Sequence, residues 1–221
     1  MLKSDDLINK VKSYNKFLNP ETLDKAYNFA VKAHENQKRH SGDPYVIHPV
    51  AVANILTELK LDSATIATGL LHDTIEDTHA TYQTIKDEFG QEVADLVEGV
   101  TKISELENQA TANSRAENFR KLIIATSKDI RVLLVKIADR LHNMRTINSI
   151  DNIEKRERIA KETMEIYSPL ADRMGMNRIR DELEDLSFEV LNPNARKLIK
   201  DRLDKIKENN LISFNAVAEE F

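Results

Sequence analysis

The sequence contains no cysteine, which excludes disulfide bonds, thiolate zinc sites and cysteine nucleophiles. It has no run of about 18 apolar residues that could span a membrane, and its first ten residues lack the apolar core of a signal peptide. Basic residues are not in excess, because 32 Lys and Arg face 37 Asp and Glu, a net charge of −5. We therefore expect a cytoplasmic protein with neither a nucleic-acid nor a membrane partner.

Glycine and proline are also scarce, with five of each among 221 residues, while helix-forming residues dominate. This composition predicts an all-α fold of about ten helices. The expected helices cover residues 4–18, 19–37, 48–59, 63–76, 82–88, 91–103, 114–127, 129–148, 152–175, 177–191 and 194–209. Residues 38–44 are expected to form a polar loop, and residues 104–113 a mobile one.

The segment 129–148 contains the run Val132–Val135, which by itself could be a buried strand. Its apolar residues nevertheless recur at i, i+3, i+4, i+7, i+8 and i+11 from Ile130, a helical stripe. The opposite, polar face of that helix then carries Lys136, Asp139, Arg140 and Asn143. A polar face of this kind is either solvated or lines a site.

Ionisable residues crowd the end of the expected helix 63–76. His72 and Glu76 stand at positions i and i+4, and so do Asp73 and Asp77. These four side chains therefore lie on adjacent turns of the expected helix. Three carboxylates and an imidazole this close need compensation from a divalent cation or from water. On this pattern alone, a polar helix end remains an alternative to a site.

Two further residues shift the balance towards a metal site. His48 begins an apolar helix, and Asp139 lies on the polar face of 129–148. Together with His72 and Asp73 they would supply two nitrogen and two oxygen ligands, a set that suits Mn²⁺, Fe²⁺ or Zn²⁺ better than Ca²⁺. The histidines His34, His79 and His142 are expected to be surface or packing residues.

The order His, His-Asp, Asp resembles the HD metal-dependent phosphohydrolase superfamily. Longer motifs across about residues 20–195 resemble the hydrolase domain of RelA/SpoT-type alarmone enzymes. These motifs are Arg39–Tyr45, His48-Pro49, Leu71–Thr78, Glu98–Lys102, Ala116–Lys121, Asp139–Thr146 and Ile166–Gly175.

The resemblance implies a bacterial enzyme that hydrolyses guanosine tetra- or pentaphosphate, (p)ppGpp, releasing the 3′-pyrophosphate and GDP or GTP. It implies one divalent ion, usually Mn²⁺, on His48, His72, Asp73 and Asp139, and a catalytic acidic pair, Glu76 and Asp77. The residues expected to bind the nucleotide or the leaving pyrophosphate are Arg39, His40, Ser41, Arg140, Asn143 and Thr146. Which member of the acidic pair is the base, and whether ppGpp or pppGpp is preferred, stay open.

The same resemblance predicts two parts, an HD hydrolase domain at 1–150 and a helical extension at 151–221. In long family members this extension leads to a synthetase domain, so the chain is expected to be either a hydrolase-only protein or a piece of a longer one. No synthetase activity is expected. A protein partner or an oligomer is possible, but neither can be inferred from the sequence.

Two other functions compete with (p)ppGpp hydrolysis. One is an HD phosphohydrolase acting on another nucleotide, such as NADPH or a nucleoside triphosphate. The other is a catalytically silent module that senses the alarmone or regulates a partner. The presence of both Glu76 and Asp77 favours an active enzyme.

Overall fold

The computed structural model describes residues 2–16, 18–108 and 128–219, with side chains except at 107–108 and 207–219. Within these ranges the chain is helical and has no β-strand beyond one isolated antiparallel bridge between Lys38 and Pro44. The all-α prediction is confirmed. The chain forms two compact units, Met1–Ile150 and Asp151–Phe221. The helix expected at 114–127 lies outside the described residues.

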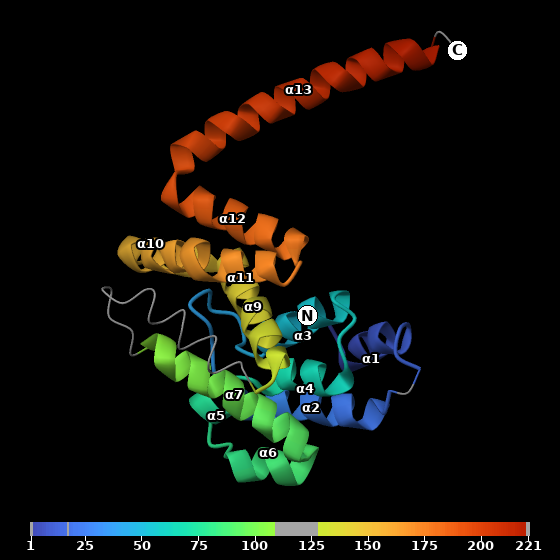
Figure 1. The fold of residues 1–221 in the computed structure, drawn as a ribbon, viewed down its shortest axis with the longest axis vertical. Helices are drawn as coiled ribbons and strands as arrows, with labels where there is room; N and C mark the ends of the chain where they lie inside the picture. Colours follow the sequence, from blue (N-terminus) through green and yellow to red (C-terminus); the bar gives the residue numbers. More distant parts are fainter. Residues whose placement is uncertain (1, 17, 109–127, 220–221) are drawn as a thin grey trace. The chain divides into compact units, whose positions relative to one another are not determined.

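The first unit is a bundle of helices (Figure 1). Its elements are α1 (Ser4–Lys12), α2 (Pro20–Ala33), α3 (Ile47–Glu58), α4 (Ser63–Leu71), α5 (Thr74–Asp77), α6 (Tyr82–Phe89), α7 (Gln91–Asn108), α9 (Ile130–Arg145) and the 3₁₀ turn η1 (Ile147–Ser149). Several helices begin at the cap that the sequence offers, since the side chains of Asn19, Asp62, Thr81 and Asp129 each accept a bond from the first turn.

Helices α3 and α4 form the centre of this unit. Helix α3 packs on α4 and α9, while α4 also contacts α2 and α7. Helix α4 carries no charged residue, and its side chains are buried from Thr65 to Leu71. Gly69 allows α3 to approach closely, because a Cβ at this position would lie 3.3 Å from the Cα of Ala53. This close packing fixes the ends of α3 and α4, where His48 and His72 lie.

The expected helix 63–76 is interrupted. Helix α4 ends at Leu71, and α5 begins only at Thr74. Side chains hydrogen-bond to the last backbone carbonyls of α4. His72 Nδ1 lies 2.9 Å from the carbonyl oxygen of Gly69, and the Thr74 hydroxyl donates to the carbonyl oxygen of Leu71 at 2.6 Å. The prediction of one continuous helix was therefore wrong, and His72 and Asp73 occupy the turn between two helices.

The other boundary errors have similar local causes. Helix α1 ends at Lys12, where the Ser13 hydroxyl donates to the carbonyl of Lys10, and α2 ends at Ala33 rather than at residue 37. Residues 104–108, expected to be in a loop, form the last turn of α7. The rest of that expected loop, 109–113, lies outside the described residues.

The second unit consists of α10 (Ile153–Glu162), the π-helical turn η2 (Thr163–Tyr167), α11 (Ser168–Arg173), α12 (Asn177–Leu191) and α13 (Pro193–Glu219). Helix α12 packs on α10, η2 and α11, and the buried side chains include Tyr167 and Leu183. The expected helix 152–175 is thus continuous in outline but changes to a π-helical turn in its middle. Apolar side chains of α13 are at least half exposed, namely those of Leu198, Ile199, Leu203 and Ile206.

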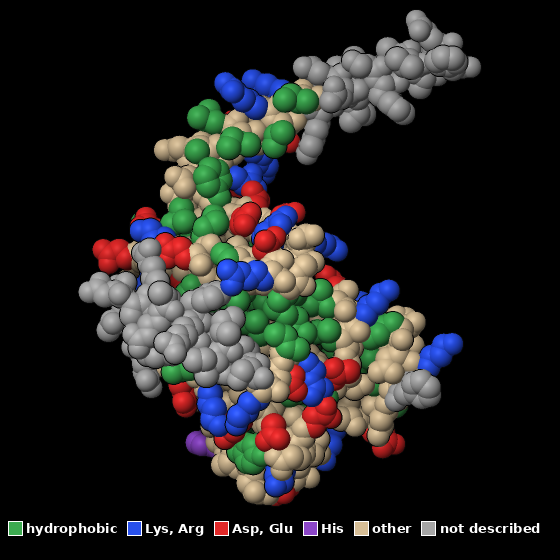
Figure 2. Space-filling model, in the orientation of Figure 1, with side chains coloured by type: hydrophobic (Ala, Val, Ile, Leu, Met, Phe, Trp, Pro, Cys, Tyr) green, Lys and Arg blue, Asp and Glu red, His purple; other side chains and the backbone are tan. Residues whose placement is uncertain are grey.

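Basic and acidic side chains are interspersed on the face drawn in Figure 2. Among the described residues, no helix combines the length and the apolar character that a membrane span requires.

Candidate active site

A polar cavity of about 450 Å³ opens in the first unit between α3, α5, α7 and α9. The side chains that line it come from four stretches of the sequence, 38–48, 73–77, residue 104 and 136–143. They are Lys38, Arg39, His40, Tyr45, His48, Asp73, Glu76, Asp77, Ser104, Lys136, Asp139 and Asn143. A volume of this size suits a small-molecule ligand.

Most of the predicted site residues line this cavity. Of the described residues, Ser41, His72, Arg140 and Thr146 are the predicted ones that do not. His72 lies directly behind the lining, against Asp73. The Ser41 hydroxyl donates to Asp43, Arg140 is buried, and the Thr146 hydroxyl donates to backbone carbonyls of its own helix end.

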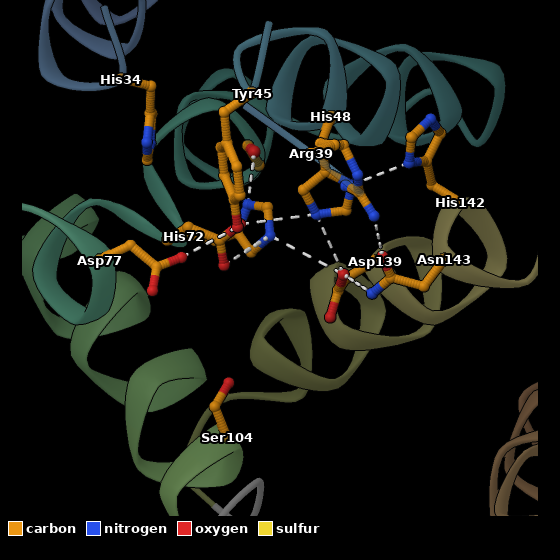
Figure 3. Close-up of polar contacts among 12 residues, drawn as sticks. His34, Arg39, Tyr45, His48, His72, Asp77, Ser104, Asp139, His142 and Asn143 are labelled. Carbon is orange, nitrogen blue, oxygen red and sulfur yellow. Dashed lines mark hydrogen bonds and ion pairs between the residues drawn. The ribbon is translucent and has the colours of Figure 1, made fainter. Parts of the chain in front are cut away.

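His48, His72, Asp73 and Asp139 converge at one end of the cavity, and Figure 3 shows the two histidines and Asp139 pointing toward one another. His48 Nε2 lies 3.2 Å from Asp139 Oδ1 and 3.5 Å from Asp73 Oδ2. His72 Nε2 lies 3.1 Å from Asp73 Oδ1 and 3.9 Å from Asp139 Oδ1. Both rings are buried, with 2% and 1% of the surface of His48 and His72 exposed.

The hydrogen bonds around His72 define which of its nitrogens carries the proton. Its Nδ1 lies 2.9 Å from the Gly69 carbonyl oxygen, an acceptor, so Nδ1 carries the hydrogen. The Nε2 atom then carries a lone pair, and it lies 3.1 Å from Asp73 Oδ1. Among the described residues, this buried nitrogen has no hydrogen-bond partner. An imidazole held by a carbonyl on one side, with a free lone pair on the other, is the arrangement that metal-binding histidines adopt.

The charges of the cluster are fixed by its surroundings. Burial opposes ionisation of Asp139, but Lys136 and His48 hold its pKa well below the usual range. The pKa of Asp73 is also lowered, since attraction to His72 and His48 outweighs the effect of burial. Burial lowers the pKa of His48, and burial with repulsion from His48 and Arg39 lowers that of His142 to about 3. Both aspartates are therefore anionic at neutral pH, and burial favours the neutral form of the His48 and His142 rings.

These groups fit a divalent metal ion. His48, His72 and Asp139 offer ligand atoms that all lie within 4.8 Å of one another, and Asp73 adds a fourth. The unpaired lone pair of His72 and two close carboxylates are costly to bury unless a cation compensates them. The mixed nitrogen and oxygen donors match ions such as Mn²⁺, Fe²⁺ and Zn²⁺.

Tyr45 connects this cluster to the acidic pair. Its hydroxyl lies 2.8 Å from Asp73 Oδ2 and 2.9 Å from Asp77 Oδ2. The ring stacks on His34 at a centroid distance of 4.7 Å. Burial and the two carboxylates raise the pKa of the Tyr45 phenol, so it stays a proton donor. A single hydroxyl thus sets the positions of two carboxylates that stand at the two ends of α5.

Glu76 lies on the other wall of the cavity, near Lys136 and Ser104. The Lys136 ammonium donates to Ser104 Oγ at 3.0 Å and to Asp139 Oδ2 at 3.1 Å. Burial raises the pKa of Glu76, while Lys136 opposes that effect. A carboxylate with a raised pKa next to a cation is suited to exchanging a proton near neutral pH.

Arg39 and Asn143 form the rim. The Arg39 guanidinium donates to Asn143 Oδ1 at 2.8 Å and lies 5.8 Å from the centre of the Tyr45 ring. Asn143 Nδ2 in turn donates to Asp139 Oδ1 at 2.6 Å. The loop that carries Arg39 is closed by backbone bonds between Arg39 and Asp43 and by Gly42, whose φ of +86° suits glycine. The rim cation is therefore tied to the Asp139 carboxylate through one amide.

The sequence interpretation missed several residues of the site. Lys136 was visible on the predicted polar face, three residues before Asp139, and Tyr45 stood in a quoted motif. Ser104 was placed in a loop, and no pattern pointed to Lys38. His142, expected to pack, has its Nδ1 at 2.7 Å from His48 Nδ1.

The fold and the site together define the class of the protein. Residues 26–177 match the HD domain family, more than half of the chain, and the chain belongs to this family. The match includes all four residues of the histidine and aspartate cluster. The cluster is therefore the His, His-Asp, Asp set from which the resemblance was first inferred.

Three particular proteins are similar to this chain. The GTP pyrophosphokinase rsh of Brucella melitensis is 52% identical over 210 residues, which are 95% of this chain and 28% of that protein. The bifunctional (p)ppGpp synthase/hydrolase SpoT of Escherichia coli K12 is 54% identical over 187 residues, 85% of this chain and 26% of that protein. The chain thus spans about a quarter of the length of these relatives. A solved structure of a metazoan SpoT ortholog, which hydrolyses ppGpp, superposes with a TM-score of 0.59 at 26% identity, covering 76% of this chain and 94% of that one.

Proposed function

We propose that this chain is a (p)ppGpp 3′-pyrophosphohydrolase that depends on a divalent ion, Mn²⁺ in the first instance. Water attacks the 3′-diphosphate, the bond to the 3′ oxygen breaks, and pyrophosphate and GDP or GTP are released. The observation that carries the proposal is the buried two-histidine, two-aspartate cluster, which lies next to Glu76 and Asp77 in one cavity. The relatives named SpoT, and the ppGpp-hydrolysing ortholog, support the substrate.

The ion would be held by His48, His72, Asp73 and Asp139. When bound, it would polarise a phosphoryl oxygen and make water a better nucleophile at neutral pH. The chain's own contribution is to favour the neutral ring of His48, by burial, and the charged forms of both aspartates. Tyr45 and Asn143 hold the two aspartates in place.

Glu76 is the better candidate for the general base. Its pKa is raised, mainly by burial, so it can accept a proton from water near neutral pH. Asp77 is engaged instead, since it accepts the Tyr45 hydroxyl through its side chain while Gln37 donates to its backbone carbonyl at 2.6 Å. We therefore assign Asp77 the role of orienting the water and Glu76 that of taking its proton.

Three cations in the lining are available for the leaving pyrophosphate and the 5′-phosphates. Lys136 is buried beside Glu76, whereas Lys38 and Arg39 stand at the rim. The substrate is highly anionic, so such cations are needed against the four carboxylates of the cavity. Lys136 and Lys38 replace Arg140 in this role, because Arg140 does not line the cavity.

The test is to incubate the purified chain with ppGpp and Mn²⁺, with and without a chelator, and to separate the nucleotides by chromatography. GDP and pyrophosphate in equal amounts, and only with the ion, are expected. Glu76→Gln should lower kcat by about 100-fold or more while keeping ppGpp binding. Glu35→Gln, an exposed glutamate outside the cavity lining, is the matched control. Binding without turnover by the unchanged chain would instead indicate a sensing module, and turnover of a different nucleotide a different HD phosphohydrolase.

A further inference from the structure

The ring of His142 lies behind the metal-binding cluster, outside the cavity lining (Figure 3). Its Nδ1 lies 2.7 Å from Nδ1 of His48, and the two ring centres are 4.9 Å apart. Both side chains are buried, with 8% and 2% of their surface exposed. This contact joins α9 to the first turn of α3.

A hydrogen bond between two neutral imidazoles allows only two arrangements, because each ring carries one N–H. In the first, His48 donates from Nδ1 to His142, and the lone pair of His48 Nε2 points into the cluster. In the second, His142 donates from Nδ1, and His48 carries its hydrogen on Nε2, directed at Asp139 Oδ1 3.2 Å away.

The contents of the cluster decide between these arrangements. Without a cation, the second is favoured, since it places an N–H rather than a lone pair against the oxygens of Asp139 and Asp73. A bound cation needs the lone pair and therefore requires the first. The change conserves protons: His48 loses its Nε2 hydrogen and gains one on Nδ1, while His142 loses its Nδ1 hydrogen and gains one on Nε2.

We propose that His142 is a positioning residue that accepts a hydrogen bond from His48 and so holds His48 in the form that binds the metal ion. This inference rests on one part of the proposed function, the metal centre. His142 itself does not line the cavity. His72 offers a comparison within the same cluster, because its Nδ1 is held by a carbonyl that can only accept. The Nδ1 of His48 instead faces the Nδ1 of His142, which can either donate or accept a hydrogen bond.

The first measurement is a Mn²⁺ titration without substrate. Binding is measured from the electron paramagnetic resonance signal of the ion that stays free. His142→Phe keeps a ring but removes the acceptor, and it should weaken Mn²⁺ binding about 10- to 100-fold. His142→Asn places an amide oxygen near the position of Nδ1 and should restore binding to within about threefold of the unchanged chain. His79→Phe changes an exposed histidine and is the matched control, with unchanged binding.

The second measurement needs no variant. Ring ¹⁵N spectra of histidine-labelled protein should show the hydrogen of His48 on Nε2 without metal and on Nδ1 after saturation with Zn²⁺, a diamagnetic probe. His48 that keeps its hydrogen on Nε2 with metal bound would overturn the inference, as would His142→Phe that binds Mn²⁺ like the unchanged chain. No Mn²⁺ binding by the unchanged chain would overturn the metal centre of the proposed function and this inference with it.

Discussion

Replacing Tyr45 by phenylalanine removes one oxygen from the site and leaves the rest of the side chain. The hydroxyl lies within 2.9 Å of carboxylate oxygens of both Asp73 and Asp77. The ring contacts with His34, at 4.7 Å, and with His48, at 6.0 Å between centres, do not involve that oxygen. The substitution therefore tests the hydrogen bonds apart from the packing.

The expected magnitude follows from the bonds that are lost. One proton is shared between two anionic acceptors, and a hydrogen bond to a charged group contributes about 1.5–3 kcal/mol. Since about 1.36 kcal/mol corresponds to a tenfold change in rate, Tyr45→Phe should lower kcat about 10- to 150-fold. The bond from Tyr45 also lowers the pKa of Asp73. Without it that pKa rises, so protons should compete with Mn²⁺ for Asp73 at a higher pH in the variant, and the Mn²⁺ titration should show this.

The assay is ppGpp hydrolysis under saturating Mn²⁺ across pH, with a Mn²⁺ titration of each protein. Tyr82→Phe is the matched control, because the Tyr82 hydroxyl donates to the carboxylate of Asp95 at 2.7 Å outside the cavity lining. It should leave kcat unchanged. If kcat of the Tyr45→Phe variant is within about twofold of that of the unchanged chain at every pH, the hydroxyl does not position Asp73 and Asp77 for the reaction.

Three other perturbations test the metal centre, the buried cation and the helix packing. Mn²⁺ at about 100 times its Kd should stabilise the fold by about 2.7 kcal/mol, seen as a chelator-reversible rise in Tm; an unchanged Tm would argue against a metal site. Lys136→Met should raise the pKa of Glu76 further and shift the acid limb of kcat/KM upward; an unshifted limb would remove Lys136 from the mechanism. Gly69→Ala places a Cβ 2.6 Å from Leu56 Cδ1, and its overpacking of about 1–3 kcal/mol should outweigh the helix-propensity gain of about 1 kcal/mol; increased stability in urea would contradict this.

The identity of the cluster could be predicted from the sequence because each member stands in a distinctive local pattern. His48 begins an apolar helix, His72 and Asp73 follow another, and Asp139 lies on the polar face of a third. Periodicity assigns such residues to faces and ends of helices. Periodicity does not predict which groups hydrogen-bond to the other ring nitrogen of each histidine or the other oxygen of each aspartate. Those partners depend on how α3, α4 and α9 pack. Tyr45, which bonds two carboxylates from a loop, has no periodic signature at all.

The end of α7 shows how composition misled the prediction. The polar run after Ile103 was taken as a loop, yet Ser104 to Asn108 are helical. Glu98 and Lys102 pair at 2.7 Å across one turn, and the Ser104 hydroxyl is within 3.4 Å of the Val100 carbonyl oxygen. Because the helix continues, Ser104 is held within 3.0 Å of Lys136 and becomes part of the cavity wall. Polarity alone does not distinguish a solvated loop from the wall of a polar site.

Helix α9 illustrates why neighbouring residues can act on different sides of one site. Asn143, four residues after Asp139, lies on the same face and bonds its carboxylate. His142 is turned by about 100° from Asn143 and reaches His48 instead. The first bond lies within α9, whereas the second depends on the contact between α9 and α3. A shift of α9 would therefore move the Asp139 carboxylate and the partner of the His48 ring together, so the packing of these two helices sets the geometry of the proposed metal centre.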